Sequence, residues 1–151
     1  CKTASLIANS AKAIGVLSDV DQDSLNSLYF FGRQLGLAFQ VVDDILDFTG
    51  NDEQLGKPAA SDLQSGYLTA PVFFALEENP SLSKLINGKF SKKDDLEKAL
   101  SIVRDSGAIR KSRELAEKFA SEARDSIRWL PDSPSKKALL ELPEFVISRL
   151  Y

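Results

Sequence analysis

Apolar residues recur at helical spacing along most of this chain. Residues 2–17 hold apolar side chains among small alanine and serine residues, which predicts a helix that packs closely against its neighbours. Residues 25–48 contain no proline and are apolar on most sides, and the acidic and hydroxyl side chains of residues 21–24 can cap their first turn. This second stretch predicts a long, deeply buried helix.

The rest of the chain predicts shorter helices separated by glycine and proline. Residues 49–63 are rich in Gly, Asn, Asp, Ser and Pro and indicate an ordered loop. A helix is expected at residues 63–78, ending where Pro80 disfavours the helical state of its predecessor. Pro143 should bend or break the last helix. Amphipathic stretches predict the remaining helices at residues 82–86, 93–104, 108–129 and 136–150.

The composition fits one all-α globular domain. With 151 residues and 43% apolar content, the chain can bury one sizeable core. A net charge of −3 and the absence of a dense basic patch give no sign of nucleic-acid binding. The longest uncharged apolar stretches, such as residues 71–76, are far shorter than the roughly 20 residues that span a bilayer, so no transmembrane segment is predicted.

The chain contains no histidine and a single cysteine, Cys1. These counts exclude Ser-His-Asp and Cys-His nucleophilic mechanisms, an internal disulfide and an ordinary zinc site. Any chemistry therefore has to use carboxylates, lysine, arginine, hydroxyls or a bound metal. The first residues show neither an initiator methionine nor a signal-peptide pattern, and the chain is expected to begin within an element of a longer protein.

An acidic cluster lies near the end of the long helix. Gln40, Asp43, Asp44 and Asp47 fall within an arc of about 100° on a helix, and the other positions around them are apolar. The aspartates are therefore expected to point into a cavity, where clustered carboxylates require a cation. Oxygen ligands without His or Cys favour Mg2+ or Ca2+. A solvated acidic face paired with lysine or arginine explains the same spacing.

Two lysines could bring positive charge to such a metal. Lys57 lies between Gly56 and Pro58, shortly after the acidic cluster, and Lys2 is followed by the hydroxyl of Thr3. A lysine held near a metal suits a metal-bridged diphosphate, although a single lysine is more often only solvated. Only the joint occurrence of these residues favours a diphosphate site.

In this order and spacing the motifs resemble those of the trans-isoprenyl diphosphate synthase family. The similarity is to long-chain polyprenyl synthases of the solanesyl type from plastids and cyanobacteria, and it covers essentially the whole chain. It rests on the short runs at residues 2–3, 36–40, 43–47, 55–57 with 61–62, and 68–71.

The resemblance implies an all-α helical bundle of the isoprenoid synthase type, with residues 1–151 as the C-terminal half of a polyprenyl synthase domain. It implies condensation of isopentenyl diphosphate with an allylic diphosphate, assisted by Mg2+. Asp43, Asp44 and Asp47 match the second acidic motif and would bind the metal. By the same resemblance, the allylic diphosphate would be contacted by Lys2, Thr3, Gln40 and Lys57. Of these, Lys2, Thr3 and Gln40 would also be catalytic.

The chain departs from the family pattern in two places. Tyr67 stands where the family often has lysine, and no second Asp-Asp-x-x-Asp occurs. The chain is therefore expected to be an inactive fragment of a longer enzyme or a degenerate paralogue. A non-catalytic partner subunit, a helical interaction domain and a terpene cyclase stay open as alternatives. For the whole enzyme the resemblance implies a homodimer, in a plastid or in the cytoplasm of a cyanobacterium.

Overall fold

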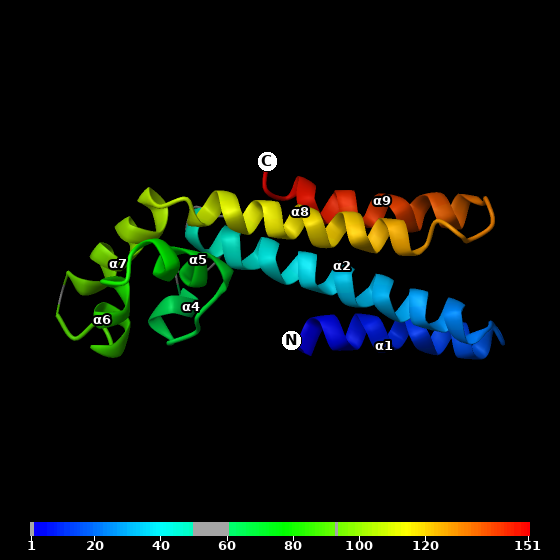
Figure 1. Cartoon of the computed structure of the whole chain (residues 1–151), viewed down its shortest axis with the longest axis horizontal. Helices are drawn as coiled ribbons and strands as arrows, with labels where there is room; N and C mark the ends of the chain where they lie inside the picture. The colour runs from blue at the N-terminus through cyan, green and yellow to red at the C-terminus, as the bar shows by residue number, and fades with distance from the viewer. Residues whose placement is uncertain (1, 50–60, 93) are drawn as a thin grey trace. The chain divides into compact units, whose positions relative to one another are not determined.

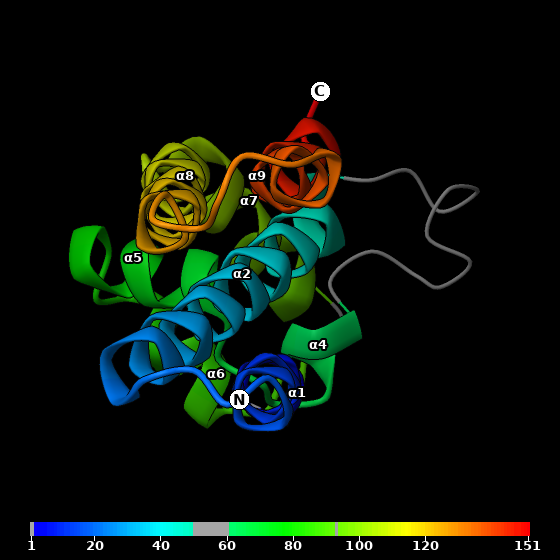
Figure 2. The ribbon, with the colours of Figure 1, turned by 90° about the vertical axis from the view of Figure 1, so that its right-hand side faces the viewer.

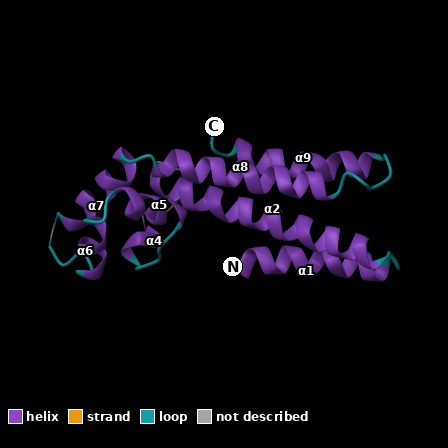
Figure 3. Ribbon diagram, in the orientation of Figure 1, coloured by secondary structure: helices purple, strands orange, loops and turns teal. Residues whose placement is uncertain are grey.

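A computed structural model describes residues 2–49, 61–92 and 94–151, and every regular element within these ranges is a helix (Figure 3). The all-α prediction is therefore confirmed. The first two helices are α1 at Lys2–Leu17 and α2 at Gln22–Thr49. The other helices are α4 (Ser61–Gln64), α5 (Ala70–Glu78), α6 (Leu82–Asn87), α7 (Asp95–Asp105), α8 (Ala108–Ser126) and α9 (Pro134–Ser148).

The first two helices begin and end close to where the sequence predicts. α1 has the predicted bounds, and α2 begins three residues earlier than residue 25 because Asp21 caps it. The Oδ1 atom of Asp21 accepts hydrogen bonds from the backbone amides of Asp23 and Ser24, both at 2.9 Å. The bonds from the Ser24 amide and hydroxyl lower the pKa of the Asp21 carboxyl below its ordinary value of 3.8. Figure 1 shows the short turn that joins the two helices.

The single helix expected at residues 63–78 is wrong. The chain forms the short α4, then a turn at residues 65–69, and only then α5. Gly66 has φ +82°, a left-handed conformation that ends a helix and that glycine adopts without steric cost. Pro71 lies in the first turn of α5, where its missing N–H costs no helical hydrogen bond, so it begins a helix instead of continuing one.

The last helix is continuous through Pro143, so of the bend or break expected there the break is wrong. Proline leaves the carbonyl of the residue four positions earlier without its helical partner, a cost of about 3 kcal/mol in an exposed helix. Here the Pro143 ring is fully buried, and burial of apolar surface offsets part of that cost. At the other end of α9, the hydroxyl oxygen of Ser133 accepts a hydrogen bond from the Lys136 amide at 3.1 Å.

The chain divides into two compact units, each with its own packing. Unit 1 consists of Cys1–Val42 and Leu115–Tyr151, and unit 2 consists of Asp43–Glu114. In unit 1, Gln34 of α2 donates a hydrogen bond to Glu122 of α8, and α9 runs back beside α8 (Figures 1 and 2). One cluster of its core contains Phe31, Ala123 and Ile127. The core of unit 2 contains Phe48, Leu63, Val72, Ala75, Leu82, Ala99, Val103 and Ala108.

Across the three described ranges, none of the helices combines the length and the apolar character that crossing a membrane requires. α2 has 28 residues and would be long enough, but it carries charged side chains along its length.

Candidate functional site

One continuous helix carries the glutamine and the three aspartates that the sequence singles out. Because α2 is unbroken from Gln22 to Thr49, Gln40, Asp43, Asp44 and Asp47 keep the helical spacing expected of them. Asp44 is 9% exposed and Asp47 is 1% exposed, while Asp43 is half-buried. Burial of two carboxylates argues against a fully solvated acidic face.

Asp44 and Asp47 meet the beginnings of the two helices that follow in the chain. The Oδ1 atom of Asp47 accepts a hydrogen bond from the Ser61 hydroxyl, and its Oδ2 atom accepts one from the Asp62 amide, both at 3.3 Å. The Oδ2 atom of Asp44 accepts a hydrogen bond from the Ala70 amide at 3.4 Å. These donors stabilise negative charge in a buried place, where an ionised carboxylate without hydrogen bonds would be costly.

The donor atoms fit a hard divalent cation. The cluster offers only carboxylate oxygens, which Mg2+ and Ca2+ prefer over the sulfur and nitrogen ligands of zinc. Within residues 2–49, 61–92 and 94–151, no three acidic, histidine or cysteine side chains are grouped closely enough to hold a metal ion by themselves. Mg2+ usually takes one or two protein carboxylates and completes its shell with water and substrate phosphate.

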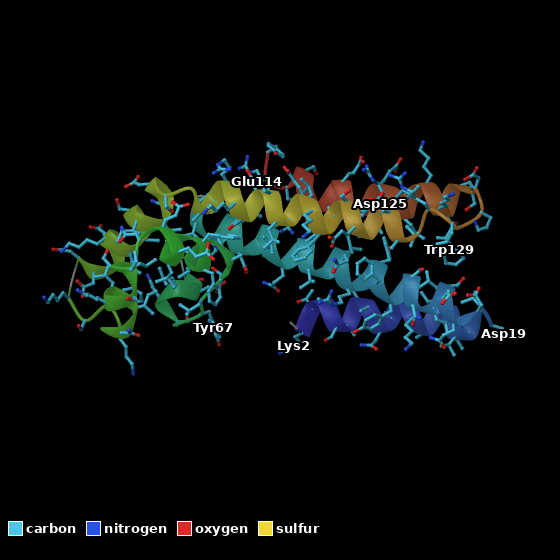
Figure 4. The ribbon with its side chains drawn as sticks, viewed as in Figure 1. Lys2, Asp19, Tyr67, Glu114, Asp125 and Trp129 are labelled. Atoms are coloured by element: carbon cyan, nitrogen blue, oxygen red, sulfur yellow. The ribbon has the colours of Figure 1, made fainter. Side chains whose placement is uncertain are left out.

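In unit 1, Thr3 and Gln40 lie together. The Thr3 hydroxyl donates to the Oε1 atom of Gln40 at 3.5 Å, from α1 to α2. Glycine makes this approach possible, because a Cβ atom on Gly36 would lie 2.5 Å from the Cα atom of Ala4. One turn earlier, a Cβ atom on Gly32 would lie 2.6 Å from the backbone oxygen of Ile7. Lys2 is exposed in the first turn of α1, as Figure 4 shows.

The other predicted residues have different outcomes. Lys57 lies outside the residues that the structure describes, and so do Gly56 and Pro58. Tyr67 occupies the turn between α4 and α5 and is 67% exposed, with its ring directed away from the ribbon in Figure 4. The position where the family often has lysine is therefore open to solvent.

Sequence reasoning missed two features near these residues. The first is the capping of α4 and α5 by α2, which joins residues 14 and 26 positions apart and leaves no local signal. The second is the position of Arg149, whose guanidinium carbon lies 4.7 Å from the centre of the Phe39 ring, next to Gln40. Such a cation–π contact stabilises the packing of α9 on α2.

Comparison with known proteins adds to this geometry. A family model described as polyprenyl synthetase matches residues 1–103. A prenyl transferase of Synechocystis sp. is 55% identical over 150 residues, which cover 99% of this chain and 46% of that protein. The chloroplastic solanesyl diphosphate synthase 2 of Arabidopsis thaliana is 48% identical over 149 residues, covering 99% of this chain and 36% of that protein.

A solved structure gives the same result for the fold. The chain is similar to a polyprenyl synthase from Caulobacter crescentus, crystallised with calcium and isoprenyl diphosphate, with a TM-score of 0.85 and 33% identity. The likeness covers 97% of this chain and 46% of that one, and it confirms the helical fold of the isoprenoid synthase type. The chain spans less than half the length of each of these three proteins.

Proposed function

This chain belongs to the polyprenyl synthetase family, and on that premise we propose that it supplies part of a prenyltransferase that joins isopentenyl diphosphate to an allylic diphosphate. The product would be a long-chain all-trans polyprenyl diphosphate, as the name of the Arabidopsis relative supports. The observation that carries the proposal is the Asp43-Asp44-x-x-Asp47 run on α2 with two buried carboxylates, in a chain of this family.

Residues 1–151 would form the C-terminal half of the synthase domain, and the other half would bring the first acidic motif and the isopentenyl diphosphate site. Two observations support this division. The relatives are more than twice as long as the matched region. In addition, α1 exposes large apolar side chains, with Leu6 at 70% and Leu17 at 88%, which further protein could cover.

The metal would be Mg2+, held by the aspartates of α2. Enzymes of this family generally depend on Mg2+, and the Caulobacter relative was crystallised with calcium, a cation that also takes oxygen ligands. When bound, Mg2+ would supply positive charge that stabilises the departing diphosphate. Asp43, Asp44 and Asp47 would hold the metal from one side, and substrate phosphate oxygens would complete its shell.

The remaining residues would bind the allylic substrate and stabilise charge. Lys2 and Lys57 would donate hydrogen bonds to the diphosphate as it leaves, because its negative charge is greatest then. The Thr3 hydroxyl oxygen and the Gln40 Oε1 atom lie 3.5 Å apart. Both would direct their dipoles toward the positive charge that develops on the allylic carbon. The double bond of isopentenyl diphosphate then attacks that carbon and a proton is lost, so no protein nucleophile is needed.

The assembly and location of the whole enzyme are part of the proposal. A homodimer is proposed by family resemblance. A plastid is favoured by the chloroplastic synthase of Arabidopsis, and the cytoplasm of a cyanobacterium by the prenyl transferase of Synechocystis.

Substitution of Asp43 tests the proposal in a protein of the relatives' length that carries this chain, called the full-length protein below. Asp43→Asn should raise the Mg2+ concentration needed for half-maximal activity and lower kcat. Loss of one charge-stabilising group costs about 2 to 4 kcal/mol, or roughly 30- to 1,000-fold in rate. The matched control is Asp23→Asn, an exposed aspartate in the first turn of the same helix.

Product formation from radiolabelled isopentenyl diphosphate, with Mg2+ varied, measures both effects. If Asp43→Asn and Asp23→Asn behave alike and near the parent rate, the aspartate cluster has no role in prenyl transfer. If the parent protein makes no prenylated product with any allylic diphosphate, the proposed reaction is wrong.

A further inference from the structure

The end of α2 that carries the acidic run has the unfavourable sign of charge for a helix terminus. The C-terminal end of any helix bears partial negative charge and carbonyl oxygens without partners inside that helix. The last turn of α2 contains no basic residue, and Asp43, Asp44 and Asp47 add negative charge to this end. Positive charge and hydrogen-bond donors from another part of the fold would therefore stabilise it.

Arg104 of α7 brings both to this end, from 56 residues further along the chain. Its Nε and Nη2 atoms donate hydrogen bonds to the backbone oxygen of Phe48, at 3.3 Å and 3.2 Å. That oxygen lies in the last turn of α2, so no amide of the same helix can pair with it. The guanidinium therefore caps α2 and offsets the partial negative charge of its end.

Core packing explains how an arginine of α7 reaches this carbonyl. Phe48 is 1% exposed, and it shares a core cluster with Ala99 and Val103 on the buried side of α7. Arg104 directly follows Val103, so the burial that sets α7 against the end of α2 also presents the arginine side chain to Phe48. Arg104 itself is exposed, and its contribution to global stability should be small.

Arg104 has no competing ionic partner within the described part of unit 2. The two ion pairs found there both use basic residues of α8, and neither includes Arg104. The adjacent carboxylate, Asp105, instead accepts a hydrogen bond from the Ser101 hydroxyl at 2.7 Å. The positive charge of Arg104 is thus directed at the end of α2.

Building on the proposed function, we propose that Arg104 is a positioning residue for the acidic run. By capping α2 at Phe48, it keeps Asp43, Asp44 and Asp47 in the arrangement that receives Mg2+, before any metal is bound. A positive charge near a cation site would by itself weaken Mg2+ binding through repulsion. Loss of Arg104 should therefore have opposite effects on Mg2+ binding, depending on whether the residue acts by positioning or by charge alone.

Three substitutions at position 104 separate hydrogen bonding from charge. Arg104→Lys keeps the charge and donates from one nitrogen instead of two, Arg104→Gln keeps one donor group and removes the charge, and Arg104→Met removes both. The matched control is Lys98→Met, which removes a positive charge from an exposed position on the same helix. All variants are made in the full-length protein.

Two measurements report separately on the helix end and on the metal site. Hydrogen exchange of the amides of residues 46–49, without metal, reports how well the last turn of α2 is held. Steady-state kinetics gives the Mg2+ concentration for half-maximal activity and the KM for isopentenyl diphosphate. A charge at a helix end and a hydrogen bond to it each change a local equilibrium about two- to fivefold.

We expect Arg104→Met to speed this exchange about fivefold and to raise the Mg2+ requirement about threefold, because fewer molecules hold the arrangement that binds the metal. Arg104→Lys and Arg104→Gln should lie between Arg104→Met and the parent. Lys98→Met should match the parent in both measurements. The KM for isopentenyl diphosphate should stay unchanged in all four variants, whereas a general loss of structure would change it too.

Three results would overturn the inference. Parent-like exchange in Arg104→Met would show that Arg104 does not hold the end of α2. A lower Mg2+ requirement in that variant would mean that Arg104 acts only by repulsion, and an unchanged requirement with a lower Tm would leave it a purely structural role. If Arg104→Met does not fold, Arg104→Gln decides by the same criteria. Should the parent protein catalyse no prenyl transfer, the proposed function fails, while hydrogen exchange still tests the cap.

Discussion

The close contact between α1 and α2 predicts a large effect of a single methyl group at Gly36. In Gly36→Ala the new Cβ atom would lie 2.5 Å from the Cα atom of Ala4 and 3.2 Å from its backbone nitrogen. Ordinary carbon–carbon contacts are about 3.5 to 4.0 Å, so the two helices would have to separate by about 1 Å. Backbone atoms cannot rotate away as a side chain can, and the whole of α1 must move.

Two opposing terms set the size of this effect. Alanine is favoured over glycine within a helix by about 1 kcal/mol, which stabilises the variant. Overpacking of a tight contact costs about 1 to 3 kcal/mol, and displacement of α1 also lengthens the 3.5 Å contact between Thr3 and Gln40 beyond hydrogen-bonding distance. We expect net destabilisation of up to about 2 kcal/mol. The KM for the allylic substrate should rise as well, since Thr3 and Gln40 are proposed to bind it.

Gly15→Ala is the matched control within the same pair of helices. Its Cβ atom would meet the Cδ1 atom of Leu28 at 2.7 Å and the Cδ2 atom of Leu25 at 2.8 Å, both at the ends of flexible side chains. Leucine can change rotamer, so this variant should be neutral or more stable. Urea unfolding of the full-length protein compares the two. Equal stability of Gly36→Ala and Gly15→Ala would refute the reasoning, as would rescue by Ala4→Gly, which leaves the obstructing backbone unchanged.

Three further predictions concern other parts of the chain. Lys57→Gln in the full-length protein should raise KM for the allylic diphosphate and lower kcat while leaving KM for isopentenyl diphosphate unchanged. Steady-state kinetics with each substrate varied in turn measures this, and a rise in KM for isopentenyl diphosphate alone would mean that the lysine binds that substrate instead. The hydrogen bond from Lys111, followed by that from the Gly107 amide, lowers the pKa of Glu78 below its ordinary value of 4.5. The resulting stability is present above that value and is lost as pH falls through the lower folded pKa. Glu78→Gln should therefore flatten the pH dependence of Tm in that range, and an unchanged fall of Tm at acidic pH would contradict this. Thr69→Val should leave Tm unchanged or raise it, because the buried hydroxyl has no hydrogen-bond partner among the described residues. A Tm clearly lower than that of Thr69→Ser would show that the hydroxyl does have a partner.

Local patterns predicted the long helices well because local interactions form them. The capping residues before α2 and the small residues of α1 are both visible in the sequence, and both helices begin and end near the expected positions. The error at residues 63–78 has a local cause as well. Gly66 and Pro71 are residue types that commonly end or begin a helix, although the apolar residues around them favour one continuous helix. The left-handed φ of Gly66 is known only from the structure.

The candidate site was predictable in its residue types and not in its contacts. The acidic run on α2 is evident from spacing alone, and burial of Asp44 and Asp47 agrees with the expected inward orientation. The pairing of Thr3 with Gln40 depends on how closely two helices approach, which the glycine at position 36 permits but does not specify. The roles of Lys2, Thr3, Gln40, Lys57 and the aspartates stay predictions.

The hydrogen bonds from α4 and α5 change how the acidic motif should be used to recognise inactive members of the family. Asp44 and Asp47 each hold the beginning of a helix, so natural selection for a folded protein would preserve them after catalysis had been lost. In a paralogue, Asp44 and Asp47 by themselves therefore indicate the fold, and an activity assay has to establish the reaction.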